Sequence, residues 1–425
     1  DGILGSENKK TITPSEIIAN KIFAKEHTMK GAYLDHASAT PVRKEVLEAM
    51  LPYFNEQFAN PSTVYDLGSQ VKEAIEEARA NVASLIGAKP AEIVFTSSGA
   101  EANNLAIKGV AFAKQKKGNH IIVSSIEHHS VLNSARFLER LDFEATFLPV
   151  DKNGLVDPER LAKAIRPETV IASIMHANTE IGTIEPISEL AAICKEKDVV
   201  FHTDTVASVG NTRVDVNALN ADLLSLSGAS LGAPKGIGAL YFNKKVRLMP
   251  LIHGGIQENG RRAGTENVPG IIGFGKAAAL AKKELPEKIE HVRKLRDRLV
   301  EGILKKVEKV TYTGHPDKRL PGHASFCFEA IEGEALIFML VQNGIYTNTG
   351  SACASKALKT SPVLGAIGLR ADLAQGSSVF TIDAANTEAE IDYVLEKLPP
   401  VVDRLRALSP IWGKEIPDYE EKVCT

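Results

Sequence analysis

Residues 225–241 read SLSGASLGAPKGIGALY and form the most informative stretch of the chain. They connect two short apolar runs, and similar runs recur upstream, separated by helix-like segments rich in Ala and Lys. This alternation predicts an α/β domain built on a largely parallel sheet. The expected strands are Glu92–Thr96, His120–Ser124, Ala145–Val150, Val170–Met175, Val199–His202, Leu223–Ser225 and Ala239–Phe242.

Two elements are expected before the sheet, a strand at Ala32–Asp35 and a helix at Val71–Ile86. Beyond the sheet the pattern changes, which predicts a second, α+β region. Its expected elements are a long amphipathic helix at Gly270–Glu308, a strand at Ala324–Glu329, and helices at Glu388–Leu398 and Val401–Leu408. The predicted organisation is an N-terminal extension (1–32), a large domain (33–270), a small α+β domain (271–412) and a tail (413–425).

The composition is that of a folded chain: 425 residues, 44% hydrophobic and 24% charged. That balance excludes disorder, collagen and coiled coil. Lys and Arg number 50 against 53 Asp and Glu, so a net charge of -3 gives no global attraction for nucleic acid or an anionic membrane, and we expect neither as a partner. Four cysteines without zinc-type spacing, and no long apolar window or secretory signal, favour a cytoplasmic protein without a metal site.

Two strand ends carry residues that suit a bound ligand. Thr96–Glu101 follows a strand and opens a helix, so its small residues and the helix N-terminus can hold an anion. Asp204 ends another strand, where open α/β sheets bind ligands, and a carboxylate there can hold the protonated nitrogen of a pyridine cofactor. The residues alone leave the alternatives open, which are an ordinary strand-to-helix turn and a helix N-cap.

From residues 225–241 outward, the chain resembles the cysteine desulfurases, a branch of the fold-type I pyridoxal-phosphate enzymes related to class V aminotransferases. The resemblance runs from Tyr33 to Pro410, and it implies a fold-type I large domain with a mostly parallel seven-stranded sheet plus a smaller α+β domain. The matches include Tyr33–His36, Asn60–Ser62, Glu101–Lys108, Glu127 and His128, His176–Asn178, His202–Asp204, Pro234–Gly236, Gln257 and Glu258, Gly264 and Thr265, and Thr349–Cys353.

The resemblance also implies roles for individual residues. His128 would stack on the cofactor ring. Cys353 lies in a segment of small residues and matches the cysteine that takes the persulfide sulfur and passes it on, which makes it the candidate catalytic residue. The family is homodimeric, and a loop matched by Arg262–Thr265 completes the partner's site, so a homodimer is expected. The candidates for cofactor binding are His128, Asn178, Asp204, Ser227, Ser230, Ser98, Thr265 and Arg262.

The match fails within one pocket. The family's Schiff-base lysine corresponds to Ser230, and a serine hydroxyl cannot form an imine. The other departures are Ala229 for a phosphate-binding His, Ala100 for a Thr of the phosphate turn, Ala207 for a Gln at the cofactor phenol oxygen, and Ala384, beside Asp383, for an Arg that clamps the substrate carboxylate. Ser98 stands at a usual glycine and offers a compensating hydroxyl.

Three functions follow as hypotheses. The first is a desulfurase-like protein that has lost pyridoxal chemistry and handles sulfur, or an iron–sulfur cluster at Cys353, together with a scaffold or sulfur-acceptor protein. The second is an active enzyme with non-covalently held pyridoxal phosphate, in which Lys235 or His128 moves protons; otherwise Lys235 is interpreted as structural. The third is a cofactor-free pocket that serves another small ligand.

Overall fold

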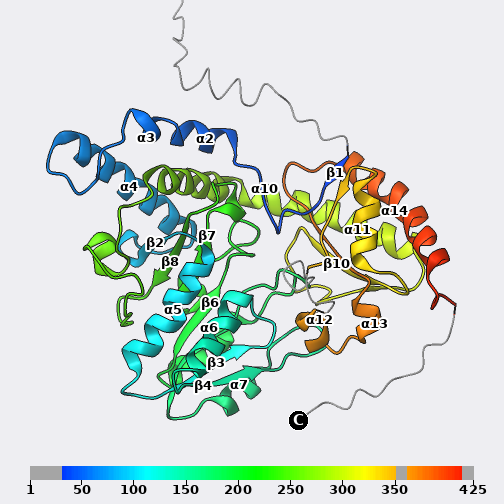
Figure 1. The fold of residues 1–425 in the computed structure, drawn as a ribbon, viewed down its shortest axis with the longest axis horizontal. Helices are drawn as coiled ribbons and strands as arrows, with labels where there is room; N and C mark the ends of the chain where they lie inside the picture. The colour runs from blue at the N-terminus through cyan, green and yellow to red at the C-terminus, as the bar shows by residue number, and fades with distance from the viewer. Residues whose placement is uncertain (1–30, 351–360, 414–425) are drawn as a thin grey trace, which may run out of the picture.

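The computed structural model describes residues 31–350 and 361–413, and its largest sheet has the order β2-β8-β7-β6-β5-β3-β4 (Figure 1). Neighbours from β4 to β7 pair in parallel, whereas β8 runs antiparallel to β2 and β7. The prediction of a mostly parallel seven-stranded sheet is therefore confirmed. The strands are β2 (Ile93–Thr96), β3 (His120–Ser124), β4 (Glu144–Leu148), β5 (Thr169–Ser173), β6 (Val200–Asp204), β7 (Leu223–Ser227) and β8 (Gly238–Phe242).

Helices cover both faces of this sheet, which is why its strands are apolar along their length. Val94 packs with α5 (Gly99–Lys114) and α6 (His129–Glu139), while its neighbour Phe95 joins α4 (Asp66–Leu85) on the other face. The remaining helices of this region are α2 (Lys44–Met50), α3 (Pro52–Asn55), α7 (Pro158–Ala164), α8 (Ile187–Glu196), α9 (Val216–Leu219) and the 3-10 turns η1 (Pro90–Glu92), η2 (Ala229–Leu231) and η3 (Gln257–Gly260).

A smaller region is built on an antiparallel sheet in the order β12-β10-β9. The first strand of the described residues lies here, because β1 pairs in parallel with β11. The elements of this region are β1 (Ala32–Tyr33), β9 (Val310–Tyr312), β10 (His323–Phe328), β11 (Ile345–Tyr346), β12 (Ser377–Thr381), α11 (Gly333–Val341), α12 (Pro362–Ala366), α13 (Ala371–Ala374) and α14 (Glu388–Leu408).

Helix α14 corrects one expectation. The two helices expected at Glu388–Leu398 and Val401–Leu408 are a single helix that continues through Pro399 and Pro400. Proline removes a backbone donor and normally ends a helix. Here Leu398, Val401 and Val402 are buried in the core of the small region, and this packing offsets the missing hydrogen bonds.

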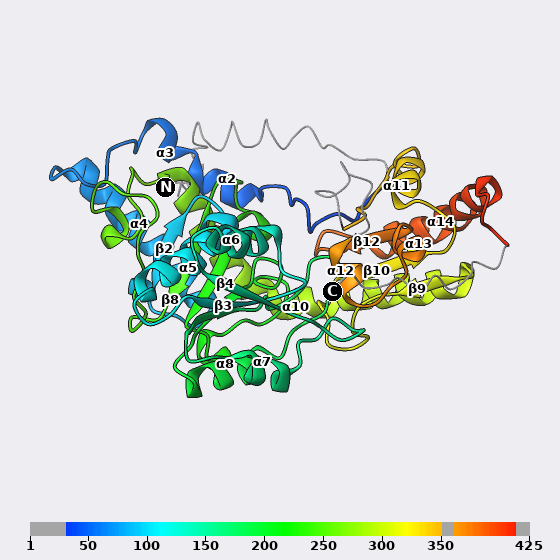
Figure 2. The ribbon, with the colours of Figure 1, turned by 60° about the horizontal axis from the view of Figure 1, so that its bottom comes forward.

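Helix α10 (Val268–Lys306) links the two regions (Figure 2). Its first half contributes Ile271 and Phe274 to the core beneath the large sheet, and its second half contributes Leu295 and Leu299 to the core of the small region. Pro286 lies inside the helix between these two halves. The domain boundary at residue 270 stays a prediction.

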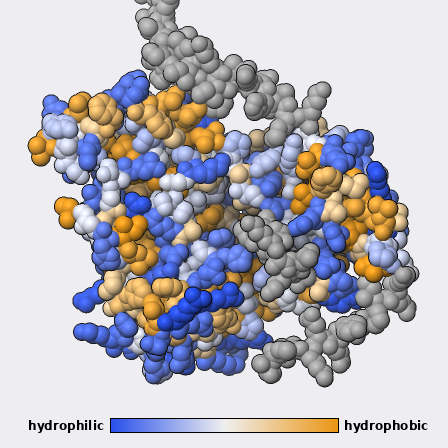
Figure 3. Space-filling model, in the orientation of Figure 1, coloured by the Kyte–Doolittle hydropathy of each residue, from blue (hydrophilic) through white to orange (hydrophobic). Residues whose placement is uncertain are grey.

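Exposed apolar side chains gather around α3 and the start of α4, among other apolar areas of the surface (Figure 3). Phe54, Phe58 and Leu67 are all more than half exposed there. Among residues 31–350 and 361–413, no helix has the length and apolar character needed to cross a membrane.

Candidate active site

A cleft lies at the carboxyl ends of β6 and β7, the edge where open α/β sheets bind ligands. It consists of two adjoining cavities of about 200 and 230 Å³ that share Thr179, Val206, Ala207 and Ser227. We call the larger one the Asp204 cavity; its polar walls include Asp204, Asn103, His128 and Ser98. The other, the Ser230 cavity, is walled by residues of both regions, including Ser230, Thr40, Asn211, His36, His323 and Asp383.

Asp204 is fixed by two hydrogen bonds at the end of β6. Its Oδ2 accepts from Asn103 Nδ2 at 2.6 Å, and its Oδ1 accepts from the Val206 N–H at 2.9 Å. Asn103 lies on the buried side of α5 and also donates to Ser130 Oγ at 2.8 Å. Burial raises the pKa of the Asp204 carboxyl. The carboxyl group is therefore held in one orientation at the cavity wall.

His128 caps the N-terminus of α6. Its Nδ1 accepts from the Ser130 N–H at 3.2 Å and lies 2.7 Å from Ser130 Oγ. The same Ser130 receives the hydrogen bond from Asn103, so His128 and Asp204 are connected through two side chains. This network positions both residues on the walls of the Asp204 cavity.

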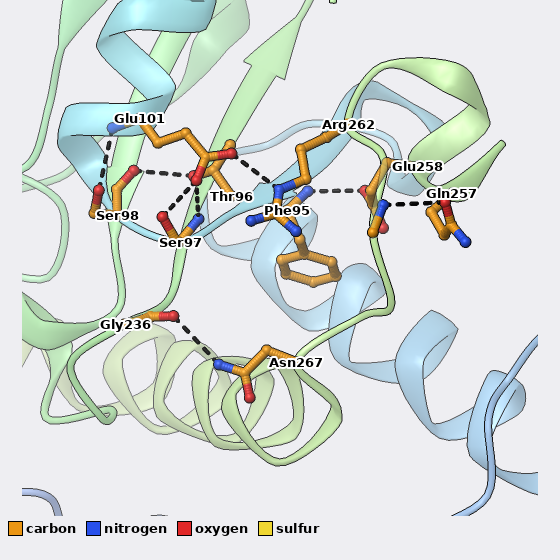
Figure 4. Close-up of polar contacts among 11 residues, drawn as sticks. Phe95, Thr96, Ser97, Ser98, Glu101, Gly236, Gln257, Glu258, Arg262 and Asn267 are labelled. Carbon is orange, nitrogen blue, oxygen red and sulfur yellow. Dashed lines mark hydrogen bonds and ion pairs between the residues drawn. The ribbon is translucent and has the colours of Figure 1, made fainter. Parts of the chain in front are cut away.

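In the turn between β2 and α5, several hydrogen-bonding groups are already bonded to residues of the turn itself (Figure 4). Ser98 is the N-cap of α5, and its Oγ accepts from the Glu101 N–H at 3.1 Å. The Glu101 carboxylate accepts from the Ser97 N–H at 2.8 Å, from the Ser97 hydroxyl, and from Arg262 Nε at 3.0 Å. Burial opposes the shift, but these hydrogen bonds lower the pKa of Glu101. An anion at this turn would lie beside the Glu101 carboxylate, which already accepts hydrogen bonds from the N–H and the hydroxyl of Ser97.

Ser230 lies on the short turn η2, where its hydroxyl donates to the Ser227 carbonyl at 2.9 Å. The Thr40 hydroxyl donates to the Ala229 carbonyl of the same turn. Lys235 lies farther along, with Nζ 3.4 Å from the Thr40 carbonyl, and it lines neither cavity. No lysine or arginine of the described residues lines either cavity.

An acidic group and two histidines border the Ser230 cavity. Asp383 Oδ2 lies 2.5 Å from Lys288 Nζ, which reaches it from α10. His36 stacks edge-on against Tyr33 at 4.9 Å, and neither of its ring nitrogens has a hydrogen-bond partner within the described residues. Burial lowers the pKa of His36, and it lowers that of His323 to about 3. Both imidazoles are therefore neutral at neutral pH.

The remaining predicted site residues lie elsewhere. Asn178 is buried outside both cavities, where Nδ2 donates to the Ile126 carbonyl and Oδ1 accepts from the Glu180 and Ile181 N–H groups. Arg262 and Thr265 line a third cavity of about 210 Å³. Cys353 lies outside the described residues.

Comparison with known proteins identifies the family. The class V aminotransferase profile (Aminotransferase class-V) matches residues 32–394. The cysteine desulfurase IscS of Methanosarcina thermophila is 52% identical over 386 residues, covering 91% of this chain and 95% of that protein. The chain belongs to the cysteine desulfurase family of class V aminotransferases. The IscS of Dictyoglomus turgidum is 51% identical over 378 residues, 89% of this chain and 96% of that protein.

Solved desulfurase-family structures share the fold. A NifS-like protein superposes with a TM-score of 0.83 at 36% identity, covering 88% of this chain and all of the other. The NifS-like protein from Rickettsia africae gives 0.80 at 29% identity, with 88% and 99% coverage. These findings confirm the resemblance and the fold class expected from the sequence.

Pyridoxal phosphate is the cofactor that this desulfurase family implies, and it supplies an electron sink for amino-acid chemistry. The residues fit only part of it. Buried Asp204, oriented by Asn103, suits a protonated ring nitrogen. Ser230 offers no amine for covalent attachment, and the side chains of Ala229 and Ala100 offer no donor to a phosphate. The cleft therefore does not fit a covalently held cofactor.

Sequence reasoning missed three residues that the structure brings to the desulfurase-type cleft. Asn103 holds Asp204, His36 borders the Ser230 cavity, and Lys288 pairs with Asp383. A polar residue on the apolar side of α5 is a signal that could have identified Asn103. Lys288 approaches the cleft through tertiary packing alone and no sequence pattern indicates it, whereas His36 lies in the matched segment Tyr33–His36 without an assigned role.

Proposed function

We propose that this desulfurase-family protein handles sulfur, or takes part in iron–sulfur cluster assembly, without covalent pyridoxal catalysis. One observation carries the proposal: Ser230, whose hydroxyl is bonded to the Ser227 carbonyl, lies where the family aligns its lysine, and no lysine among the described residues lines the cleft. An imine requires an amine, so cofactor and substrate exchange cannot proceed by the family's usual route.

Sulfur handling is proposed because the relatives are named cysteine desulfurases and because Cys353 occurs in the matching segment. The Cys353 thiolate would attack the outer sulfur of a persulfide donor. A new S–S bond forms at Cys353 as the donor's S–S bond breaks and the donor leaves as a thiolate, so the exchange needs no external oxidant. The sulfur would then pass to a scaffold or acceptor protein by the same exchange.

The test is the visible absorption spectrum of the protein after incubation with pyridoxal phosphate and thorough desalting, together with sulfide release from cysteine. We expect no retained band and no sulfide. A matched variant, Ser230→Lys with Ala229→His, should retain a band and shows that the assay can detect one. Sulfide release by the unaltered protein would overturn the proposal.

A second candidate is an active enzyme that holds pyridoxal phosphate without a covalent bond. The Asp204–Asn103 pair supports it, because this pair would suit a pyridinium nitrogen. It predicts that cofactor added in excess restores sulfide release, and that the activity disappears on desalting. The same two assays, run with and without free cofactor, separate the two candidates.

We also propose that the protein is a homodimer, as the resemblance implies. The exposed apolar side chains near Phe58 and Leu67 support a large apolar contact of this kind. Phe58→Glu should shift sedimentation toward the monomer. Phe338→Glu, at a similarly exposed phenylalanine on α11, is the matched control and should leave the dimer intact. A monomeric unaltered protein would refute the proposal.

A further inference from the structure

Helix α11 carries an apolar outer face that is open to solvent within the described part of the chain. Its residues 335–341 are all apolar, and a helix that is apolar all round is normally buried all round. Leu336 packs into the core of the small region, whereas Phe338 is 68% exposed and Val341 is 42% exposed. Together with half-buried Ile337, one turn from Val341, these two side chains form what we call the outer face of α11. A contiguous exposed apolar patch is typical of an interaction site.

The chain before residue 31 joins the fold beside this helix. The Ala32 N–H donates to the Gly344 carbonyl at 3.0 Å as β1 pairs with β11, and Gly344 follows the last residue of α11 by three positions. Gly31 itself is packed there, because a Cβ on it would lie 1.9 Å from the Gly344 carbonyl oxygen. Figure 1 shows β1 and α11 at the same end of the molecule. Residues 1–30 therefore connect to the described chain about 11 Å or less from the end of α11, the span of three extended residues.

The preceding residues include an apolar cluster that can reach this face. Four large apolar residues fall within seven positions: Ile17, Ile18, Ile22 and Phe23. The last of them is eight residues before Gly31. Eight residues of extended chain span about 26 Å, while the nine residues of α11 rise about 14 Å along the helix axis, so the cluster can reach every part of the outer face. The class V match begins at residue 32, so this segment lies outside the part that the family profile describes.

The charges on the two sides are of opposite sign. Glu332 and Glu334 are exposed at the start of α11, and neither forms an ion pair with another described residue. Residues 330–348 contain no lysine or arginine. Between residues 17 and 30, one carboxylate, Glu26, stands against three lysines, which are Lys21, Lys25 and Lys30. Opposite charges across a contact favour one partner over others.

From these observations we propose that residues 17–30 bind to the outer face of α11 in the same chain. In this arrangement the apolar cluster covers Phe338 and Val341, and the lysines lie near Glu334. A segment on so short a tether has an effective concentration in the millimolar range, so even a small apolar contact is well populated, which favours the chain's own segment over a separate partner. No residue of α11 lines either cavity of the cleft, so this inference goes beyond the proposed sulfur handling and fails independently of it.

The test is limited digestion of the full chain with trypsin, with mass spectrometry to follow each cleavage. Cleavage after Lys21 and Lys25 requires release of the bound segment, so its rate follows the population of the released form. Phe338→Asn should raise both rates at least about tenfold, because it replaces the exposed ring with a small polar amide. Cleavage after Lys10, outside the bound residues, should not change and is the internal reference. Phe137→Asn, at a 42% exposed ring on α6, is the matched control. Unchanged rates after Lys21 and Lys25 in Phe338→Asn would overturn the proposal.

Ile18→Asn tests the same contact from the side of the segment, without altering any residue of α11. It should raise the cleavage rates after Lys21 and Lys25 as much as Phe338→Asn does, and the double variant should show no further increase. Ile3→Asn, outside the apolar cluster, is the matched control and should leave the rates unchanged. If the two single effects multiply in the double variant, the two side chains do not share a contact and the proposal is wrong.

A second copy of the chain is the alternative occupant of the outer face. Because the proposed contact is intramolecular, the cleavage rates after Lys21 and Lys25 should not depend on protein concentration. Phe338→Asn should also leave the sedimentation of the protein unchanged. Protection that grows with protein concentration, or an oligomer that is lost in Phe338→Asn, would assign the face to a contact between copies and overturn the proposal.

Discussion

The two halves of the cleft differ in how far the fold depends on their polar side chains. In the Asp204 cavity, one carboxylate receives hydrogen bonds from Asn103 of α5 and from the backbone of Val206, and Asn103 extends the network to α6. In the Ser230 cavity, the one hydrogen bond that the Ser230 hydroxyl makes within residues 31–350 and 361–413 goes to the Ser227 carbonyl, three residues earlier. A site residue that also holds helices together resists replacement, whereas one that serves chemistry alone can change while the fold persists.

The largest expected effect is at Asp204. Asp204→Ala leaves two buried donors without an acceptor, so we expect a loss of about 3 kcal/mol in the free energy of unfolding. Urea denaturation followed by circular dichroism measures it. A loss below about 1 kcal/mol would mean that the Asp204 cavity is no more integral to the fold than the Ser230 cavity.

The second prediction concerns pH, through a carboxyl group behind the Asp204 cavity. Burial raises the pKa of Glu185 from 4.5 to about 8, and its N–H donates to the His176 carbonyl. Between these values the folded state binds more protons than the unfolded state. The contribution of Glu185 to stability is therefore greatest below about pH 4.5 and falls as pH rises to about 8, by at most about 1.4 kcal/mol per pH unit.

Glu185→Gln tests this by removing the titration. The difference in unfolding free energy between the variant and the unaltered protein should grow in favour of the variant as pH rises from 5 to 8. Glu189→Gln, on the exposed side of α8, is the control and should leave the slope unchanged. A constant difference across this range would contradict the expectation.

A smaller effect is expected at Ser230 itself. Ser230→Ala removes one hydrogen bond to a nearby carbonyl on a half-buried turn, so the free energy of unfolding should fall by about 1 kcal/mol or less. The same denaturation assay as for Asp204→Ala compares the two halves directly. A loss as large as that of Asp204→Ala would remove the distinction between them.

The smallest effect is expected at Lys235. Among the described residues, the Lys235 side chain makes one hydrogen bond, at 3.4 Å to the Thr40 carbonyl, so Lys235→Met should change stability by no more than about 0.5 kcal/mol. It should also leave the absorption spectrum with pyridoxal phosphate unchanged. A spectral change would assign Lys235 a role as the relocated amine, and the active-enzyme candidate would then gain support.

Much of the fold could be predicted because its strands are short apolar runs buried on both faces. The expected strand His120–Ser124 coincides with β3, and the helix expected at Gly270–Glu308 is α10, shifted by two residues. Helix α14 was predicted wrongly at its prolines, since local propensity could not anticipate that buried neighbours would carry the helix through them.

The candidate site was less predictable, because residues converge on it from distant parts of the chain. Asp204 ends β6 and could be predicted from that position at the edge of the sheet, whereas His128 was predicted from the family resemblance alone. Lys288 lies on α10 and meets Asp383 after β12, a pairing across 95 positions that no local pattern indicates. The roles assigned to the candidate site residues, from Asp204 and His128 to Asn178, Thr265 and Cys353, stay predictions.

Helix α10 is one of several connections that hold the two regions together around the cleft. It packs at one end beneath the large sheet and at the other in the small region, and Pro286 interrupts its hydrogen-bond ladder two residues before Lys288. The regions are also joined in the wall of the Ser230 cavity, where His323 Nε2 donates to the Thr179 carbonyl and the Leu320 N–H donates to the Gly182 carbonyl. A bend at Pro286 alone therefore cannot widen the cavity, because widening also requires these two hydrogen bonds to break.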